Sequence, residues 1–212
     1  MFLKILLGIW MAGVIVAAFL VTPPGGRDFL DPDSARIIIF HVPNAVVAVT
    51  AFFVAMLYAV KYLRGRDLRD DAKSAISAEL GLVFAALAIV TGSLFARMQW
   101  GSWWNWDPRE TGMVVLLLVY AAYFALRSAV DGADRRASLS AVYGIMAIAP
   151  MLFLTLVLPR VVFSLHPPTA VAYPKAQRLV LVPAMLGFLG LYLWLFRIRT
   201  AVAEVRLKLK RY

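Results

Sequence analysis

The sequence predicts an all-α protein, a polytopic bundle of six membrane-spanning helices with short segments at the outer membrane face. Of its 212 residues, 62% are hydrophobic and 16% are charged, whereas a soluble chain carries about 25% charged residues. Apolar stretches of about 20 residues recur, and each is long enough to cross a hydrocarbon core. They are continuously apolar rather than alternating, which argues against a β-barrel. We expect spans near residues 2–21, 35–62, 76–96, 111–127, 138–158 and 178–198.

The basic residues are spread unevenly over the connections, and this asymmetry predicts the orientation in the membrane. Most of the 22 Lys and Arg residues lie at the start of the first span or at and beyond the ends of the second, fourth and sixth. Since the side rich in Lys and Arg faces the cytoplasm, we expect both termini there. The loops near 22–34, 97–110 and 159–177 then face outward. We expect 2–21 to be an uncleaved first span and 1–212 to form one membrane domain.

Composition narrows the function. A net charge of +10 would suggest nucleic acid as a partner of a soluble protein. In a membrane protein, orientation in the membrane and contacts with anionic headgroups of the lipid bilayer explain this positive charge better. The chain has no cysteine, which excludes disulfides, iron–sulfur clusters and thiolate-ligated metals. No phosphate-binding loop, HExxH or nucleophile elbow occurs, so we expect a binding and transfer protein rather than an enzyme.

Local signals predict where several helices begin. Asp33 or Ser34 can cap the second span. The sequence DPRE at 107–110 has Asp at the N-cap, Pro at the first helical position and Glu at the third, which is typical of a helix start. Pro174 stands just before the sixth span. Glu79 is expected as a carboxylate in the first turn of the third span.

The only two histidines, His41 and His166, both fall on the predicted outer side. His41 should lie about two turns inside the second span, and His166 in a segment after the fifth. One buried imidazole is explained by packing and a hydrogen bond. Two on the same face also fit axial ligation of haem iron. Zinc is a poorer candidate, because no cysteine and few carboxylates could complete four ligands.

Four of the six tryptophans lie in the segment WGSWWNWDPR at 100–109. An aromatic belt at the bilayer surface explains them as well as a platform for a flat ligand does. If 100–107 forms a helical turn, three tryptophans share a face with the carboxylate that ends the segment. These residues are Trp100, Trp103, Trp104 and Asp107. Arginines at the rim would pair with haem propionates. The candidates are Arg97, Arg109, Arg160 and Arg178.

Three functions are compatible with these residues. A haem-delivery protein would hold its ligand near the surface, where it can be passed on. A b-type electron-transfer subunit would usually hold haem between histidines inside the spans. A transporter permease would use the tryptophans only as interfacial anchors, and it would purify without haem absorbance.

Three motifs resemble those of one family. WGSWWNWDPRET at 100–111 resembles the tryptophan-rich WWD signature of haem-handling proteins in cytochrome c maturation. The sequence HVP at 41–43 resembles a motif of the CcmC branch, the haem-transfer subunit of the system I pathway. Ser164-Leu-His166-Pro resembles its second histidine motif. Six spans in 212 residues also match that branch.

The resemblance implies a function and partners. Such proteins bind haem b as transient cargo at the outer, periplasmic face of the bacterial inner membrane. His41 and His166 would be the axial ligands. Trp100, Trp103, Trp104 and Trp106 would form the platform, with Asp107 at its end. Such proteins pass haem to the chaperone CcmE and work with the CcmA–CcmB ABC transporter and the small subunit CcmD.

Overall fold

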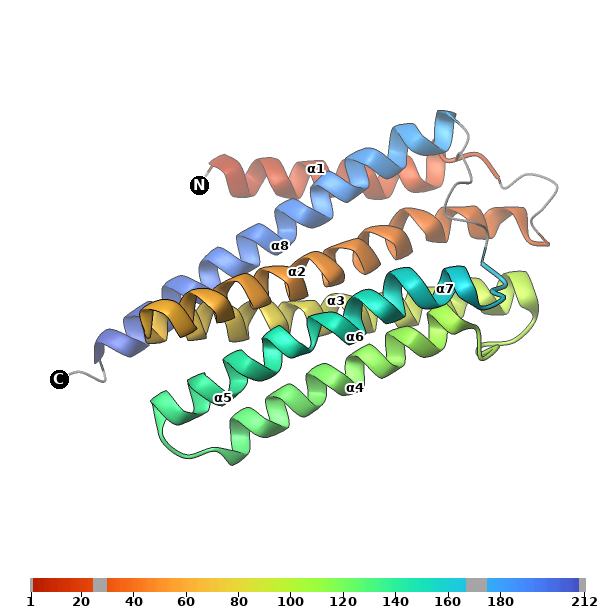
Figure 1. Ribbon diagram of the computed structural model, residues 1–212. Coiled ribbons are helices and arrows are strands. Elements are labelled where there is room, and N and C mark those ends of the chain that lie inside the picture. The colour runs from red at the N-terminus through yellow and green to blue at the C-terminus, as the bar shows by residue number, and fades with distance from the viewer. Residues whose placement is uncertain (1, 25–29, 167–174, 210–212) are drawn as a thin grey trace.

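The computed structural model describes residues 2–24, 30–166 and 175–209, and within them all regular structure is helical (Figure 1). Among these residues, six helical runs are long and apolar enough to cross a membrane, so the expected number of spans is confirmed and the chain is a multi-pass membrane protein. The elements are α1 (Phe2–Leu20), η1 (Pro32–Ile37), α2 (Ile38–Gly65), α3 (Leu68–Trp100), α4 (Pro108–Ala129), α5 (Ala133–Met146), α6 (Ile148–Leu152), η2 (Phe153–Val157), α7 (Leu158–Val161) and α8 (Lys175–Leu209).

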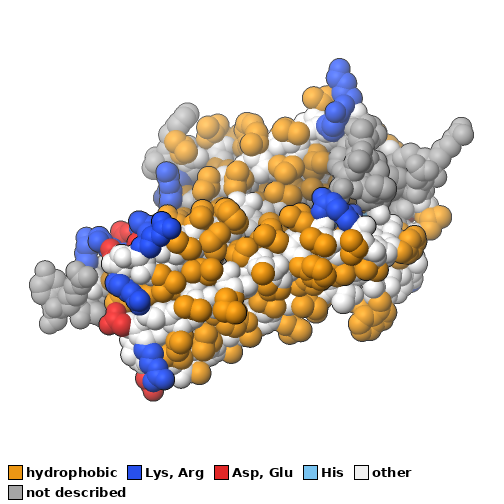
Figure 2. Space-filling view, viewed as in Figure 1, with side chains coloured by type: hydrophobic (Ala, Val, Ile, Leu, Met, Phe, Trp, Pro, Cys, Tyr) orange, Lys and Arg blue, Asp and Glu red, His pale blue; other side chains and the backbone are white. Residues whose placement is uncertain are grey.

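The helices run roughly along one direction, and the beginning of α1 and the end of α8 lie at the same end of the bundle (Figure 1). We call this the terminal end, and the opposite one the loop end. The face visible in Figure 2 is apolar along its length, and most of its Lys, Arg, Asp and Glu side chains gather near the terminal end. A wide apolar zone with charged ends suits a bilayer core between two polar interfaces.

Several helices are longer than the apolar stretches that predicted them. The third was expected from about residue 76 but begins at Leu68, because Asp67 accepts a hydrogen bond from Arg69 N at 2.9 Å and caps a polar first turn. Glu79 was therefore wrongly expected in the first turn. It lies about three turns inside α3 and pairs with Arg199 at 2.6 Å. Hydropathy does not detect helical turns that continue beyond the apolar core.

The segment before α2 also corrects an expectation. Asp31 is the cap, rather than Asp33 or Ser34: its carboxylate accepts from Asp33 N at 3.0 Å, and Pro32 takes the first helical position. Ser34 instead donates its hydroxyl to Asp31 O at 2.7 Å. The predicted 22–34 loop is thus shortened by the helical run that starts at Pro32.

The fifth span is continuous from Ala133 to Val161 but not uniformly α-helical. Residues Phe153–Val157 form a π-helical turn between α6 and α7. Such turns often occur at functional sites, and this one lies beside the cavity described below. The expected start of the sixth span beside Pro174 cannot be compared, because 167–174 lie outside the described residues; α8 begins at Lys175.

The helices α2 and α3 form the most extensive helix pair of the bundle. Small residues allow their backbones to approach closely, as in other membrane helix pairs. A Cβ on Gly81 would lie 2.6 Å from Phe52 Cε1, and the Phe52 ring stacks on Tyr120 with centroids 3.6 Å apart. Ser77 donates to Ala51 O at 2.7 Å across the same interface. This contact fixes α2 against α3 and so positions everything α2 carries.

Replacing Gly81 with Ala should lower the free energy of unfolding by about 1–3 kcal/mol, because the added methyl group meets a Phe52 ring held by Tyr120. Equilibrium unfolding in mixtures of SDS and mild detergent measures this change. Gly13→Ala is the matched control, since a Cβ there meets nothing within 4 Å. Phe52→Leu in the Gly81→Ala background should restore part of the loss. Unchanged stability of Gly81→Ala would contradict this packing.

Candidate functional site

A cavity of about 440 Å³ opens between α2, α3, α4 and the run from η2 to α7. Its volume lies within the range of cofactor and small-molecule sites. Aliphatic side chains make up most of the wall. The aromatic and charged lining residues are His41, Trp104, Arg109, Glu110 and His166. Residues more than one hundred positions apart therefore meet around one apolar space.

His41 lies in the first turn of α2, at the loop end of the bundle. The helical run begins at Pro32, which confirms that this histidine lies about two turns inside the span. Its Nδ1 is 3.0 Å from Ala88 O on α3. A carbonyl only accepts, so Nδ1 carries the proton and Nε2 keeps its lone pair. A Cβ on Gly92 would lie 2.9 Å from His41 Cε1, so only glycine leaves room for the ring.

His166 follows α7 and is held by Asp107, with Nδ1 2.9 Å from Asp107 Oδ1. Burial lowers the pKa of His166 to about 4, although the Asp107 carboxylate acts in the opposite direction. The imidazole is therefore neutral at neutral pH. Because its Nδ1 donates to a carboxylate, the lone pair is again on Nε2. Both histidines thus share one tautomer and line the same cavity.

The Asp107 carboxylate connects the start of α4 to the segment before His166. It accepts from Arg109 N at 2.9 Å, which confirms it as the N-cap of α4. It also accepts from Ser164 Oγ at 2.9 Å and from Leu165 N at 2.6 Å. Burial tends to raise the pKa of Asp107, but the backbone donors and nearby His166 outweigh this and hold it below its usual value. The side chain is therefore an ionised, buried anchor.

Glu110, at the third position of α4, departs from the capping pattern suggested by the sequence. Glu110 accepts from Asn105 N at 2.9 Å, rather than from the N–H of the cap residue. This bond holds the tryptophan-rich segment against the first turn of α4. The other carboxylate oxygen, Glu110 Oε1, is buried and has no hydrogen-bond partner in the described chain. The acid thus contributes to the cavity wall as well as to the loop.

The tryptophan-rich segment is not a helical turn, contrary to our expectation. Gly101 ends α3 with a φ of 75°, and Trp106 has a φ of 56°, so the backbone leaves the right-handed helical conformation at both positions. The shared face disappears as a result. Trp104 lines the cavity, and Trp100 packs edge-on against His166 with centroids 5.0 Å apart. Trp103 and Trp106 are 58% and 77% exposed.

The four candidate arginines are not equivalent. Arg97 and Arg160 are exposed and donate to backbone carbonyls of their own segments, Gly101 O and Leu156 O. Arg178 is exposed on the first turn of α8. Arg109 alone of the four lines the cavity, and its Nε is buried without a hydrogen-bond partner among the described residues. Only this guanidinium is placed to meet an anion inside the cavity.

Sequence reasoning missed the residues that support the histidines. Ser164 and Gly92 touch Asp107 and His41, but neither belongs to a spacing pattern that predicts such contacts. Gln99 is another: it donates to Asp31 O at 2.7 Å and accepts from Leu30 N at 3.0 Å. It therefore fastens the segment before α2 to the end of α3. For Gln99, the one available sequence signal was its place as a polar residue at the end of an apolar stretch.

The fold and cavity define a class, a multi-pass helical membrane protein with two histidines on an apolar cavity at one end of the bundle. The family model for heme exporter protein C, CcmC, matches residues 1–211. The chain therefore belongs to the CcmC family, as its motifs suggested. This membership is consistent with haem handling in cytochrome c maturation.

Individual relatives support the assignment. The heme exporter protein C of Paracoccus denitrificans is 30% identical over 189 residues, which cover 85% of this chain and 77% of the relative. The protein of the same name from Rhodobacter capsulatus is 30% identical over 186 residues, 82% of this chain and 76% of the relative. That of Escherichia coli K12 is 37% identical over 109 residues, 51% of this chain and 44% of the relative.

Replacing Asp107 with Ala should free the segment 162–166, because three of its hydrogen bonds end on that carboxylate. Hydrogen–deuterium exchange should then be faster at Leu165 and His166. Asp67→Ala is the matched control, since it removes the cap of α3 at the terminal end. It should leave exchange at 162–166 unchanged. Equal protection of that segment in Asp107→Ala and wild type would disprove the anchor.

Proposed function

We propose that this protein binds haem in the cavity at the loop end, with His41 and His166 as axial ligands, and passes it to a haem chaperone. The observation that supports this proposal is that the two imidazoles have the same tautomer. Each donates Nδ1–H to an acceptor and leaves Nε2 as a lone-pair donor on one cavity. Metal-bound histidines generally have their other nitrogen fixed in this way.

The rest of the wall fits the chemistry of haem. The macrocycle is flat and apolar, which suits aliphatic walls and the Trp104 indole. Its propionates are anions, and the unpartnered Nε of Arg109 offers a charge-assisted hydrogen bond. We therefore assign Arg109, rather than Arg97, Arg160 or Arg178, as the inner propionate contact. Trp100 supports His166 from the side.

Haem would be transient cargo, here haem b, rather than a resident electron carrier. Both histidines lie at one end of the bundle, and Trp103 and Trp106 extend from the same loop toward the outside. We assign these two exposed tryptophans to the surface from which haem leaves. By this proposal the loop end faces the periplasm, the membrane is the bacterial inner membrane, and CcmE receives haem with CcmA–CcmB and CcmD as partners.

His41→Ala and His166→Ala should each reduce co-purified haem by about tenfold or more, because a bis-histidine site loses one ligand. The low-spin absorption spectrum should also be lost from whatever haem remains. Soret absorbance per mole of protein, with and without CcmE co-expressed, measures binding and transfer together. Trp103→Ala, measured without CcmE, serves as the control for binding and should retain haem. Unchanged spectra in both histidine variants would contradict the ligand assignment.

A redox titration and the haem content of the wild-type protein distinguish the other two functions. A stable, reversible haem redox couple with no transfer to CcmE would indicate an electron-transfer subunit. Wild-type protein without any Soret band, purified from haem-replete cells, would indicate a permease whose tryptophans are interfacial anchors.

A further inference from the structure

The first turn of α4 carries a base and an acid that line the histidine cavity side by side, Arg109 and Glu110. Arg109 Nε and Glu110 Oε1 are both buried, and neither atom has a hydrogen-bond partner among the described residues. In that part of the chain neither side chain forms an ion pair. Burying a charged group without a partner costs free energy, so both groups favour a further polar contact at the cavity wall.

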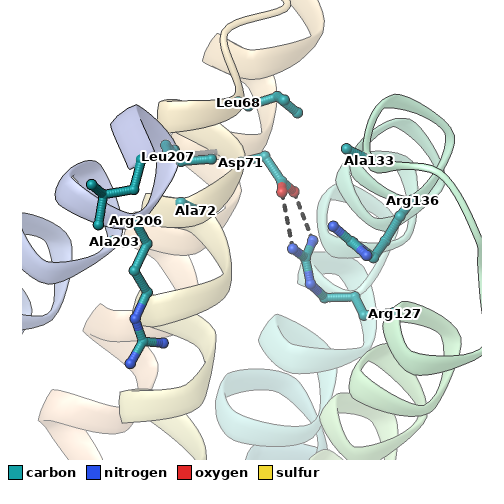
Figure 3. Close-up of a pocket in the computed structure, with 10 residues that line it drawn as sticks. Leu68, Asp71, Ala72, Arg127, Ala133, Arg136, Ala203, Arg206 and Leu207 are labelled. Carbon is teal, nitrogen blue, oxygen red and sulfur yellow. Dashed lines mark hydrogen bonds and ion pairs between the residues drawn. The ribbon is translucent and has the colours of Figure 1, made fainter. Parts of the chain in front are cut away.

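Another arginine of the same helix shows how two buried charges satisfy each other in this bundle. Arg127 donates two hydrogen bonds to Asp71, of 2.6 and 2.9 Å, and the close-up shows the two groups facing each other (Figure 3). Both side chains are largely buried, and each neutralises the other within the chain. Arg109 and Glu110 lack such an arrangement, so their charges remain available to a bound group.

Glu110 has a second role, because it holds the tryptophan-rich segment. Its Oε2 accepts a hydrogen bond from Asn105 N at 2.9 Å. The other hydrogen bonds of residues 102–106 stay inside that stretch, between Ser102, Trp104 and Asn105. Among the described residues, the bond to Glu110 is therefore the one hydrogen bond that ties the middle of the segment to α4.

The residues on either side of Asn105 connect the cavity to the outside. Trp104 lines the cavity, and Trp106 is 77% exposed. Their indoles pack edge to face, with ring centroids 6.0 Å apart. A change in how firmly Glu110 holds Asn105 N would therefore affect the cavity wall and the outer surface of the segment together.

We propose that Glu110 is a positioning residue that couples an anionic group of the ligand, bound at Arg109, to closure of the tryptophan-rich segment over the cavity. This inference rests on the proposed function, in which the anion is a haem propionate. A guanidinium has five N–H donors, so Arg109 can bind a propionate and still donate to Glu110 Oε1. The second contact fixes the carboxylate whose other oxygen holds Asn105 N.

This coupling is reciprocal, as thermodynamic linkage requires. If an anion at Arg109 tightens the segment, the tightened segment also retains the anion for longer. Axial ligation would then fix the iron, while Glu110 would set how readily the loaded cavity opens. The charge of Glu110 should therefore matter for a ligand that carries propionates and not for the same macrocycle without them.

Hydrogen–deuterium exchange of the purified protein, saturated with either haem or its dimethyl ester, tests this. The ester keeps the iron and the macrocycle but has no propionate charge. In wild type, exchange within 102–106 should be at least about fivefold slower with haem than with the ester, the lower range of measured coupling between sites. Glu110→Gln keeps an acceptor oxygen for Asn105 N but loses the charge, so this difference should disappear.

Release of the ligand to apomyoglobin gives a second readout. Glu110→Gln should release haem at least about fivefold faster than wild type does, whereas release of the ester should be the same in both proteins. Arg109→Gln should also abolish the difference in exchange between haem and the ester. The double variant should lose no more than either single one, because the two residues act as a unit.

Glu79→Gln is the matched control, since it makes the same substitution at an acid that pairs with Arg199 and does not line the cavity. It should keep the wild-type difference between the two ligands. Equal effects of Glu110→Gln on haem and on the ester would reduce Glu110 to a structural part of the segment and overturn the proposal. So would equal exchange with both ligands in wild type. Failure of wild type to bind either ligand would instead overturn the proposed function, and the coupling with it.

Discussion

The Asp107 carboxylate accepts hydrogen bonds from four groups, Arg109 N, Ser164 Oγ, Leu165 N and His166 Nδ1, and the histidine cavity depends on this convergence. The first bond starts α4, so the carboxylate is fixed to a membrane-spanning helix. The other three attach the chain beyond α7 to that helix. A segment without regular structure thereby presents an imidazole in one orientation. A neutral side chain could not satisfy four donors in this way.

The opposite wall of the cavity depends on packing rather than charge. Small residues allow α2 to pack closely against α3. His41 therefore donates a hydrogen bond to Ala88 O, and its ring occupies the space left by Gly92. The two histidines thus reach the same chemical state by different means, one through a carboxylate and one through a backbone carbonyl. The π-helical turn η2 lies beside them in the fifth span.

Much of this was predictable from sequence, because membrane spans, terminal charges and caps leave strong local patterns. The six spans, the cap at Asp107 and the depth of His41 were all predicted. The conformation of 100–107 was not, because Gly101 and Trp106 adopt positive φ angles that override helical spacing. The choice among four arginines was also out of reach. It depends on which side chain faces a cavity formed by helices that are distant in sequence. The start of α3, eight residues before the predicted start, was missed for another reason: Asp67 caps a polar first turn that hydropathy does not detect.

The central claim concerns the protonation of the His41 and His166 imidazoles, which belong to the only two histidines of the sequence. Selective ¹⁵N-histidine labelling of the haem-free protein, observed by NMR at neutral pH, tests it directly. We expect both rings to be neutral with the proton on Nδ1, and His166 to stay neutral until the pH falls toward about 4. In Asp107→Ala the His166 signals should change to a mixture of tautomers while those of His41 remain. A proton on Nε2 of either ring in the wild type, or a charged His166 at pH 7, would contradict the account.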